Sequence, residues 1–174
     1  MAPDDDWVRA FARQAQSDLN ARDILAAGGA EKCHRLHYLQ MGAEKICKAH
    51  LIKASGRESV RSTHACVAKV LPTIARDMFS RIPGKASIPG WQIKAIRKFA
   101  QEIETLAPAL DRQGTRADNP EYPWIGSRGS VVTPCEHAFP ALDDSDRSIL
   151  LLIRLIRKQA DLLLGEGASL SSAS

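Results

Sequence analysis

The chain has 174 residues, of which 44% are hydrophobic, and a formal net charge of +4 with a pI near 9.0. This length suits one domain with a sizeable core rather than two domains. The mildly basic balance permits nucleic-acid binding without demanding it, because domains that depend on phosphate contacts usually carry a sharper basic patch. The longest apolar run, residues 149–153, is far shorter than the roughly 20 residues of a membrane span, so no membrane association is expected.

The opening segment MAPDDDW is acidic and lacks a basic stretch followed by an apolar run, so no secretory signal is expected. The cysteines lie far apart, with no CxxC pair, at Cys33, Cys47, Cys66 and Cys135. Two of them fall on or near apolar helix faces. We therefore expect buried free thiols in a cytoplasmic protein rather than disulfides.

Two long helices are expected first. Aspartates at positions 4–6 supply an N-cap and negative charge at the positive end of a helix that should run to about Ala27, where Gly28 and Gly29 stop it. Apolar residues then recur every three or four positions over 31–54, the pattern of a helix with one buried face. The connection is very short, so the two helices should form an antiparallel hairpin.

Two further helices follow in the middle of the chain. Ser62 or Thr63 can cap a third helix, which Pro72 should kink or split. Residues 81–89 are rich in proline and glycine and are typical of a loop. A fourth helix is expected over about 91–110, with apolar residues on one side and a solvated basic face on the other.

Residues 111–142 show no helical period and form a long insert, which should pack or function because long unstructured connections are uncommon in compact domains. We predict a small hairpin around Gly126–Gly129, anchored on the bundle by Tyr122, Trp124 and Phe139.

The last helix, 143–164, is apolar over more than half of its circumference, so it should lie at the centre of the bundle or face a second protomer. The tail, 165–174, should be disordered. The predicted fold is all-α: an up-and-down bundle of four or five helices in one domain, 1–164, with one long loop insert.

Three strings resemble the HEPN family (higher eukaryotes and prokaryotes nucleotide-binding). The second helix carries Gln-Met-small-Ala-Glu-Lys from Gln40 to Lys45, followed by Lys-Ala-x-Leu from Lys48. The first helix carries Ser-Asp-Leu-Asn-Ala-Arg from Ser17 to Arg22, which resembles the Asp-Leu-x-x-Ala-type string of HEPN first helices. The Tyr-Pro-Trp string at 122–124 is similar to an insert in a subset of HEPN-like bacterial proteins. This resemblance implies a small helical bundle, often homodimeric, that belongs to nucleotide and RNA biology, including toxin–antitoxin and phage-defence systems with a nucleotidyltransferase or antitoxin partner.

Many HEPN proteins are metal-independent ribonucleases marked by an arginine, four to six intervening residues and a histidine. Arg57 and His64 meet that spacing, and Arg61 lies between them. The histidine would move the proton of the ribose 2′-hydroxyl and the arginine would stabilise charge on the phosphate. However, the pair falls between the second and third helices, and Glu58 would partly neutralise Arg57, both of which count against catalysis.

Lys45, Lys48 and Lys53 concentrate positive charge on the second helix, and Arg57 and Arg61 extend it beyond the helix exit. These lysines are the candidate contacts to RNA or nucleotide phosphate, with a plain solvated basic face as the alternative.

His34, His37 and the neighbouring Cys33 are candidate metal ligands, but a metal site here would need further ligands such as His64, Cys135 or His137. The spacing is not that of paired zinc ligands, so polar histidines on a helix edge are the favoured interpretation, without metal or cofactor. The sequence also lacks GxGxxG, GxxxxGK[ST] and GxSxG strings.

The leading hypothesis is a cytoplasmic, homodimeric HEPN-like protein that binds a nucleotide, RNA or a protein partner without catalysis. The first alternative is a metal-independent endoribonuclease that uses Arg57, Arg61 and His64 across a dimer. The second is a structural adaptor that recruits a partner through the apolar last helix.

Overall fold

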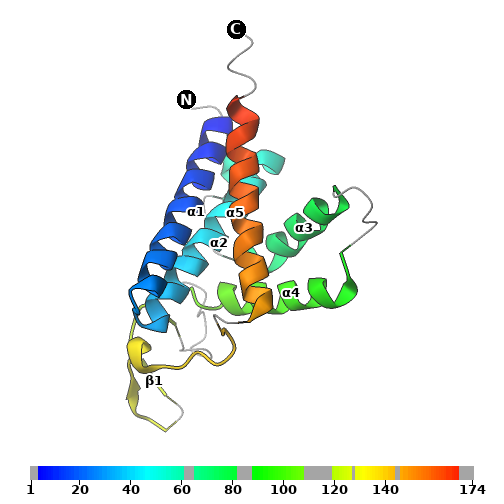
Figure 1. The fold of residues 1–174 in the computed structure, drawn as a ribbon. Coiled ribbons are helices and arrows are strands. Elements are labelled where there is room, and N and C mark those ends of the chain that lie inside the picture. Colours follow the sequence, from blue (N-terminus) through cyan, green and yellow to red (C-terminus); the bar gives the residue numbers. More distant parts are fainter. Residues whose placement is uncertain are drawn as a thin grey trace.

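The structure is a computed structural model, and it describes residues 4–60, 65–81, 88–107, 119–126, 128–143 and 146–168, with side chains up to residue 165. These segments contain five α-helices and one small two-stranded sheet, which confirms the all-α bundle with an insert before the last helix. The long helices lie side by side and α3 and α4 lie beside them, while the insert projects from one end (Figure 1). The start of α1 and the end of α5 lie at the opposite end (Figure 1).

Helix α1 (Asp4–Ala27) and helix α2 (Lys32–Ser55) form the predicted hairpin, with bounds within one residue of those expected. Three aspartates occupy the first turn of α1, where negative charge complements the helix dipole. The chain then reverses at Gly29, whose φ of +72° is a conformation that glycine adopts without strain.

The hairpin is closely packed because α2 has no side chain at Gly42. A Cβ at this position would lie 3.2 Å from Leu19 Cγ and 3.4 Å from the Ala15 carbonyl oxygen, both on α1. The small residue of the second-helix string therefore has a packing role.

Helix α3 (Val67–Ser80) begins later than the predicted cap positions allow, with Cys66 as its N-cap residue, and Ser62 and Thr63 lie outside the described residues. Pro72 lies inside this helix and does not end it. A carboxylate from another helix takes over part of the capping, because the Ala68 N–H donates to Glu104 Oε2 (3.0 Å).

Helix α4 (Gly90–Glu104) ends six residues before the predicted end at 110. The N–H groups of Leu106 and Ala107 donate to the carbonyls three residues back, which tightens the chain into a final turn. The proline at position 108 explains the early end, since proline disfavours the helical conformation in the residue before it.

Helix α5 (Arg147–Ala168) is shifted towards the C-terminus relative to the predicted 143–164. Asp146 caps the helix, since its Oδ1 accepts the Ser148 N–H (2.7 Å). The helix ends at Ala168, so it extends four residues into the predicted tail 165–174. Residues 169–174 lie outside the described residues.

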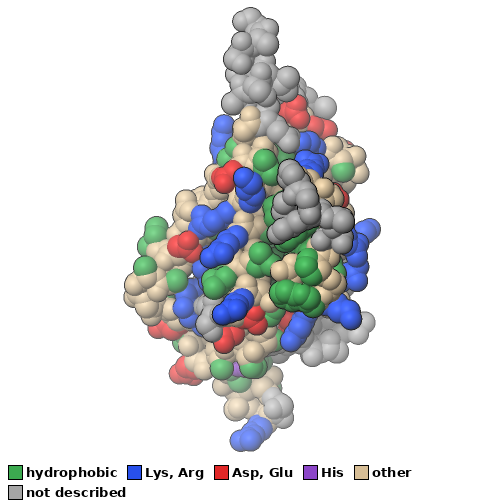
Figure 2. Space-filling model, turned by 45° about the vertical axis from the view of Figure 1, so that its right-hand side comes forward, with side chains coloured by type: hydrophobic (Ala, Val, Ile, Leu, Met, Phe, Trp, Pro, Cys, Tyr) green, Lys and Arg blue, Asp and Glu red, His purple; other side chains and the backbone are tan. Residues whose placement is uncertain are grey.

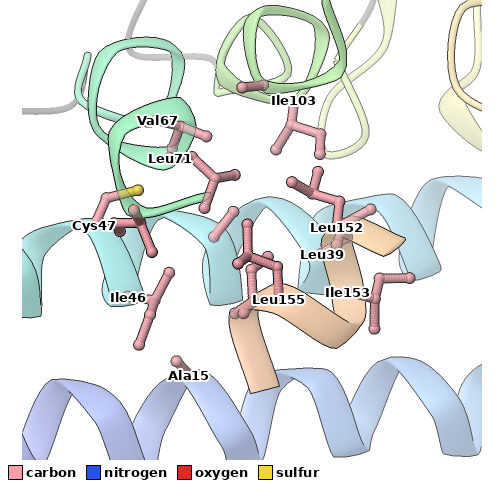
Figure 3. Close-up of a cluster of buried hydrophobic side chains, with 14 of the residues drawn as sticks. Ala15, Leu39, Ile46, Cys47, Val67, Leu71, Ile103, Leu152, Ile153 and Leu155 are labelled. Carbon is pink, nitrogen blue, oxygen red and sulfur yellow. The ribbon is translucent and has the colours of Figure 1, made fainter. Parts of the chain in front are cut away.

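The core explains the broad apolar surface of α5. Figure 3 shows Leu152, Ile153 and Leu155 of this helix among side chains from the other helices. Most of its apolar residues are buried, at Ile149, Leu152, Ile153, Leu155, Ile156, Ala160 and Leu163. The helix therefore lies at the centre of the bundle, and among its described large apolar residues Leu150 (40%) and Leu162 (38%) are the exposed ones.

The insert contains strands β1 (Trp124–Ile125) and β2 (Val131–Val132), which pair antiparallel with Trp124 opposite Val132, and a short 3₁₀ turn, η3 (Pro134–Glu136). The turn between the strands closes as predicted, with the Gly126 N–H donating to the Ser130 carbonyl (2.8 Å). This confirms the hairpin around Gly126–Gly129.

The insert is held to the start of α2 by polar and aromatic contacts. Lys32 Nζ donates to the carbonyls of Ala138 (2.8 Å) and Phe139 (3.1 Å). Phe139 is 2% exposed, and Trp124 packs beside it with ring centroids 6.4 Å apart. Two of the three predicted anchors are therefore confirmed, whereas Tyr122 is 60% exposed and does not anchor the insert.

All four cysteines are free thiols, with Cys33, Cys47 and Cys66 buried and Cys135 exposed. Among the described helices, none combines the length and apolar character that crossing a membrane would require.

Candidate functional site

A pocket of about 340 Å³ opens where α2, α3 and α5 meet. Each helix contributes side chains at positions that share one face, three or four residues apart. The lining residues are His50 and Lys53 from α2, Ile74, Asp77 and Met78 from α3 with Arg81 just after it, and Lys158, Gln159, Leu162 and Leu163 from α5.

The pocket has an apolar wall with basic groups around it. Ile74 and Leu163 are buried members of the core, so the apolar wall is fixed by packing. Lys53, Arg81 and Lys158 are exposed at the residue level, as expected when a charged head group stays in water. Three cationic side chains and one carboxylate, that of Asp77, line the pocket, so its formal charge is +2 with His50 neutral.

Such a set of groups suits an anion that carries an apolar or aromatic part. Lysine and arginine recognise phosphate through charge-assisted hydrogen bonds, and a dry apolar wall strengthens their field. Gln159, a residue that is 7% exposed, adds a side-chain amide, the kind of group that fixes the orientation of a ligand. In the space-filling view, Lys and Arg side chains are spread over the visible face with hydrophobic ones between them, rather than gathered into one large basic patch (Figure 2).

Lys45, a predicted phosphate contact, lies between α1 and α2. Its Nζ is 2.5 Å from Asp18 Oδ2, and the two side chains are 17% and 7% exposed. The other oxygen of Asp18 accepts a hydrogen bond from Gln14 Nε2 (3.1 Å). Lys45 is thus committed to an interhelical ion pair.

Lys48 forms the intrahelical ion pair that the spacing predicts. Its Nζ is 2.6 Å from Glu44 Oε1, with the side chains 14% and 12% exposed, and Gln40 Nε2 donates to the second oxygen of Glu44 (2.9 Å). Of the three candidate lysines, Lys53 is the one that lines the pocket.

Arg57 begins the short 3₁₀ segment η1 (Arg57–Val60) after Gly56 ends α2. Its Nε lies 3.6 Å from Glu58 Oε1, so the acidic neighbour is close enough to offset its charge. Arg57 also lines a second cavity, of about 420 Å³, with Trp7, Phe11, Ile52, Glu58 and Val60. Arg61 and His64, the other two residues of the ribonuclease hypothesis, lie outside the described residues.

The histidines weighed as metal ligands have other neighbours. His37 Nδ1 lies 3.3 Å from Glu121 Oε1 of the insert, and His34 Nε2 lies 3.8 Å from Glu31 Oε2. The ring of His137 contacts the rings of Trp124 and Phe139 edge-on, at 5.1 and 4.7 Å between centroids. Within the described segments, no three His, Cys, Asp or Glu side chains gather as metal ligands would.

Sequence reasoning missed most of the pocket. His50 and Arg81 stand in no motif, and Lys158 belongs to the narrow polar strip of the last helix, which consists of Arg147, Arg154, Arg157, Lys158 and Asp161. That strip in fact has two uses: Arg157 Nη2 bonds to Asp23 Oδ2 of α1 (2.7 Å), whereas Lys158, one residue on, lines the pocket. The spacing of residues along the last helix could not have distinguished Arg157 from Lys158, because their roles depend on which other helix each side chain faces.

Comparison of this chain with models of protein families, with curated proteins and with solved structures finds no significant match.

Proposed function

We propose that this chain is a HEPN-like binding protein that holds a phosphate-bearing ligand, a nucleotide or an RNA segment, in the pocket between α2, α3 and α5, without cleaving it. The observation that carries the proposal is the convergence of Lys53, Arg81 and Lys158 from different parts of the chain around one apolar wall.

The dimensions of the pocket favour a small ligand or a single nucleotide of a chain. Its volume of about 340 Å³ is near the lower end of the roughly 300–1,000 Å³ that small-molecule pockets occupy. The basic groups would hold the phosphate, and the apolar wall would contact the sugar or base. Binding of a long nucleic-acid strand would instead need basic residues repeated along a stripe of the surface.

Binding without cleavage fits the proton-transfer groups that line the pocket. Cleavage by the ribose 2′-hydroxyl needs a base for that hydroxyl and an acid for the leaving oxygen. The lining residues offer one imidazole, that of His50, and one carboxylate, that of Asp77, which is a weak base. The other ionisable groups are lysine and arginine, which are poor proton donors near neutral pH. The proposal also carries what the HEPN resemblance implies: a cytoplasmic homodimer, in a toxin–antitoxin or phage-defence setting, with a nucleotidyltransferase or antitoxin partner.

The test compares two charge reversals on the full chain. Lys158→Glu places a carboxylate in the pocket, whereas Lys94→Glu makes the same change on the exposed face of α4, outside the pocket lining. Binding of adenosine 5′-monophosphate is measured by calorimetry and binding of a labelled single-stranded RNA by fluorescence anisotropy, both at low salt. We expect Lys158→Glu to weaken binding by about tenfold or more, which is about 1.4 kcal/mol, and the control by less than about twofold.

Equal weakening by both reversals would mean that only the overall charge matters and would refute the pocket. Undetectable binding of both probes to the unmodified chain would refute the proposal as a whole. The same labelled RNA is inspected for cleavage on a gel, and products that vanish in Arg57→Ala would establish the ribonuclease alternative instead.

A further inference from the structure

Cys47 and Cys66 bring two buried thiols into contact where α2 meets the start of α3. Cys47 is 0% exposed and Cys66 is 2% exposed. Their side chains are close enough for each thiol to affect the pKa of the other. Figure 3 shows Cys47 lying next to Val67 and Leu71 of α3, whose N-cap residue is Cys66. Two residues 19 positions apart in sequence are thus placed as a local dithiol.

The surroundings make the two thiols unequal. The hydrogen bond from Cys47 lowers the pKa of Cys66, and Lys48 acts in the same direction, while burial, Glu44 and Glu104 oppose it. Burial raises the pKa of Cys47 well above its ordinary value, helped by its role as donor to Cys66. Cys66 also stands at the N-terminal end of α3, where the helix dipole favours a negative charge. A polarised pair of this kind consists of one nucleophilic sulfur and one sulfur that keeps its proton.

We propose that Cys47 and Cys66 are a reversible oxidation site, at which hydrogen peroxide converts the dithiol to an intramolecular disulfide between α2 and the first turn of α3. The proposal rests on the placement of the two side chains and is independent of the ligand proposed for the pocket.

The chemistry balances in two steps. The Cys66 thiolate attacks one peroxide oxygen, the O–O bond breaks, and the departing hydroxide takes up a proton to leave as water, which gives a sulfenic acid on Cys66. The Cys47 sulfur then attacks the Cys66 sulfur, the S–O bond breaks, and the hydroxyl leaves with the Cys47 proton as a second water. The two thiols lose two electrons in total, and the peroxide is reduced to two waters.

The other two cysteines provide the control. Cys33 and Cys135 are also neighbours, since the charge of Cys135 contributes to raising the pKa of Cys33, after the larger effect of burial. Cys135 is exposed and is the thiol most accessible to reagents and to a second chain. The variant Cys33→Ala/Cys135→Ala leaves the proposed pair as the only thiols, and its partner variant Cys47→Ala/Cys66→Ala leaves only the others.

The experiment treats the unmodified chain and both double variants with hydrogen peroxide, then unfolds them in iodoacetamide. Peptide mass spectrometry identifies the products. In the unmodified chain and in Cys33→Ala/Cys135→Ala, we expect a disulfide to join the Cys47 and Cys66 peptides. The joined pair should be lighter by two hydrogens than the sum of the two reduced peptides. Non-reducing gels should show this bond within monomers, and dithiothreitol should restore two alkylatable thiols. The oxidised chain should also unfold at a higher urea concentration than the reduced chain, because the cross-link restricts the unfolded state.

The proposal is overturned if Cys47 and Cys66 of the unmodified chain remain alkylatable after all of Cys135 has reacted. It is equally overturned if Cys66 stops at an oxidised acid that dithiothreitol does not reverse, because the second sulfur would then be unable to reach it. Since the unmodified chain is tested directly, these outcomes do not depend on whether the variants fold.

Discussion

The ion pair between Asp18 and Lys45 allows a sharp distinction between a packing role and a nucleic-acid role for a lysine on α2. In Lys45→Met, the apolar stem is kept and the ammonium group is lost. The Asp18 carboxylate, 7% exposed, then retains the hydrogen bond from Gln14 (3.1 Å) and has lost its charged partner at 2.5 Å. A buried charge left in this state destabilises the folded protein.

The magnitude follows from the burial of the two groups. Removing one partner of a fully buried pair costs roughly 3–5 kcal/mol. Lys45 is 17% exposed and Asp18 keeps one hydrogen bond, so we expect the lower end, about 3 kcal/mol. With a urea dependence of about 2 kcal/mol per molar, the unfolding midpoint should fall by about 1.5 M.

The assay is urea unfolding followed by circular dichroism. Lys94→Met, at an exposed position on α4 outside the pocket lining, is the control and should change stability by less than about 0.5 kcal/mol. The double variant Asp18→Leu/Lys45→Met should recover most of the loss, because it leaves no unpaired charge. If Lys45→Met unfolds like the unmodified chain but binds RNA less tightly, the packing role is wrong and Lys45 is a phosphate contact.

Three further predictions concern the packing, the insert and the thiols. Gly42→Leu should lower stability by about 1–3 kcal/mol, seen as a lower Tm, because the added side chain meets Leu19; an unchanged Tm would contradict the close approach of α1 and α2. Trp124→Ala should release the insert, so that limited proteolysis cuts the insert faster while the helix content stays unchanged. An unchanged cutting rate would show that the Lys32 contacts alone are enough to hold the insert. Burial raises the pKa of Cys33 above its ordinary 9.0, so above this pH the thiol ionises in the unfolded chain before it does so in the folded one. The free energy of unfolding should therefore fall as the pH rises. Urea titrations from pH 8 to about 10 should show a smaller fall for Cys33→Ala.

The parts of the fold that local patterns determine were predicted closely. The bounds of α1 and α2 follow from an aspartate-rich start and glycine ends, and the insert hairpin follows from Gly126 and Gly129. The predicted helix boundaries were less accurate for α4 and α5. Helix α5 was expected from 143 but begins at Arg147, after the cap residue Asp146, and periodicity alone does not locate a helix end to within a few residues.

The candidate site was predicted less well, because it depends on which helices face each other. Lys45, Lys48 and Lys53 are alike in a sequence pattern, yet two are in ion pairs with buried carboxylates and one lines the pocket. The acid opposite Lys45 comes from α1, 27 residues earlier, and the lysine opposite Lys53 comes from α5. Local spacing contains no information on these pairings.

The contacts of α1 with both α2 and α5 also have a consequence for the order in which the chain folds. Contacts between α1 and α2 are local and can form soon after α2 is made, whereas the bond from Arg157 to Asn20 joins residues 137 positions apart. Until α5 has been synthesised, the nascent hairpin therefore leaves an apolar face uncovered. This transient exposure makes the late arrival of α5 the step at which the growing chain is most open to aggregation and to chaperone binding.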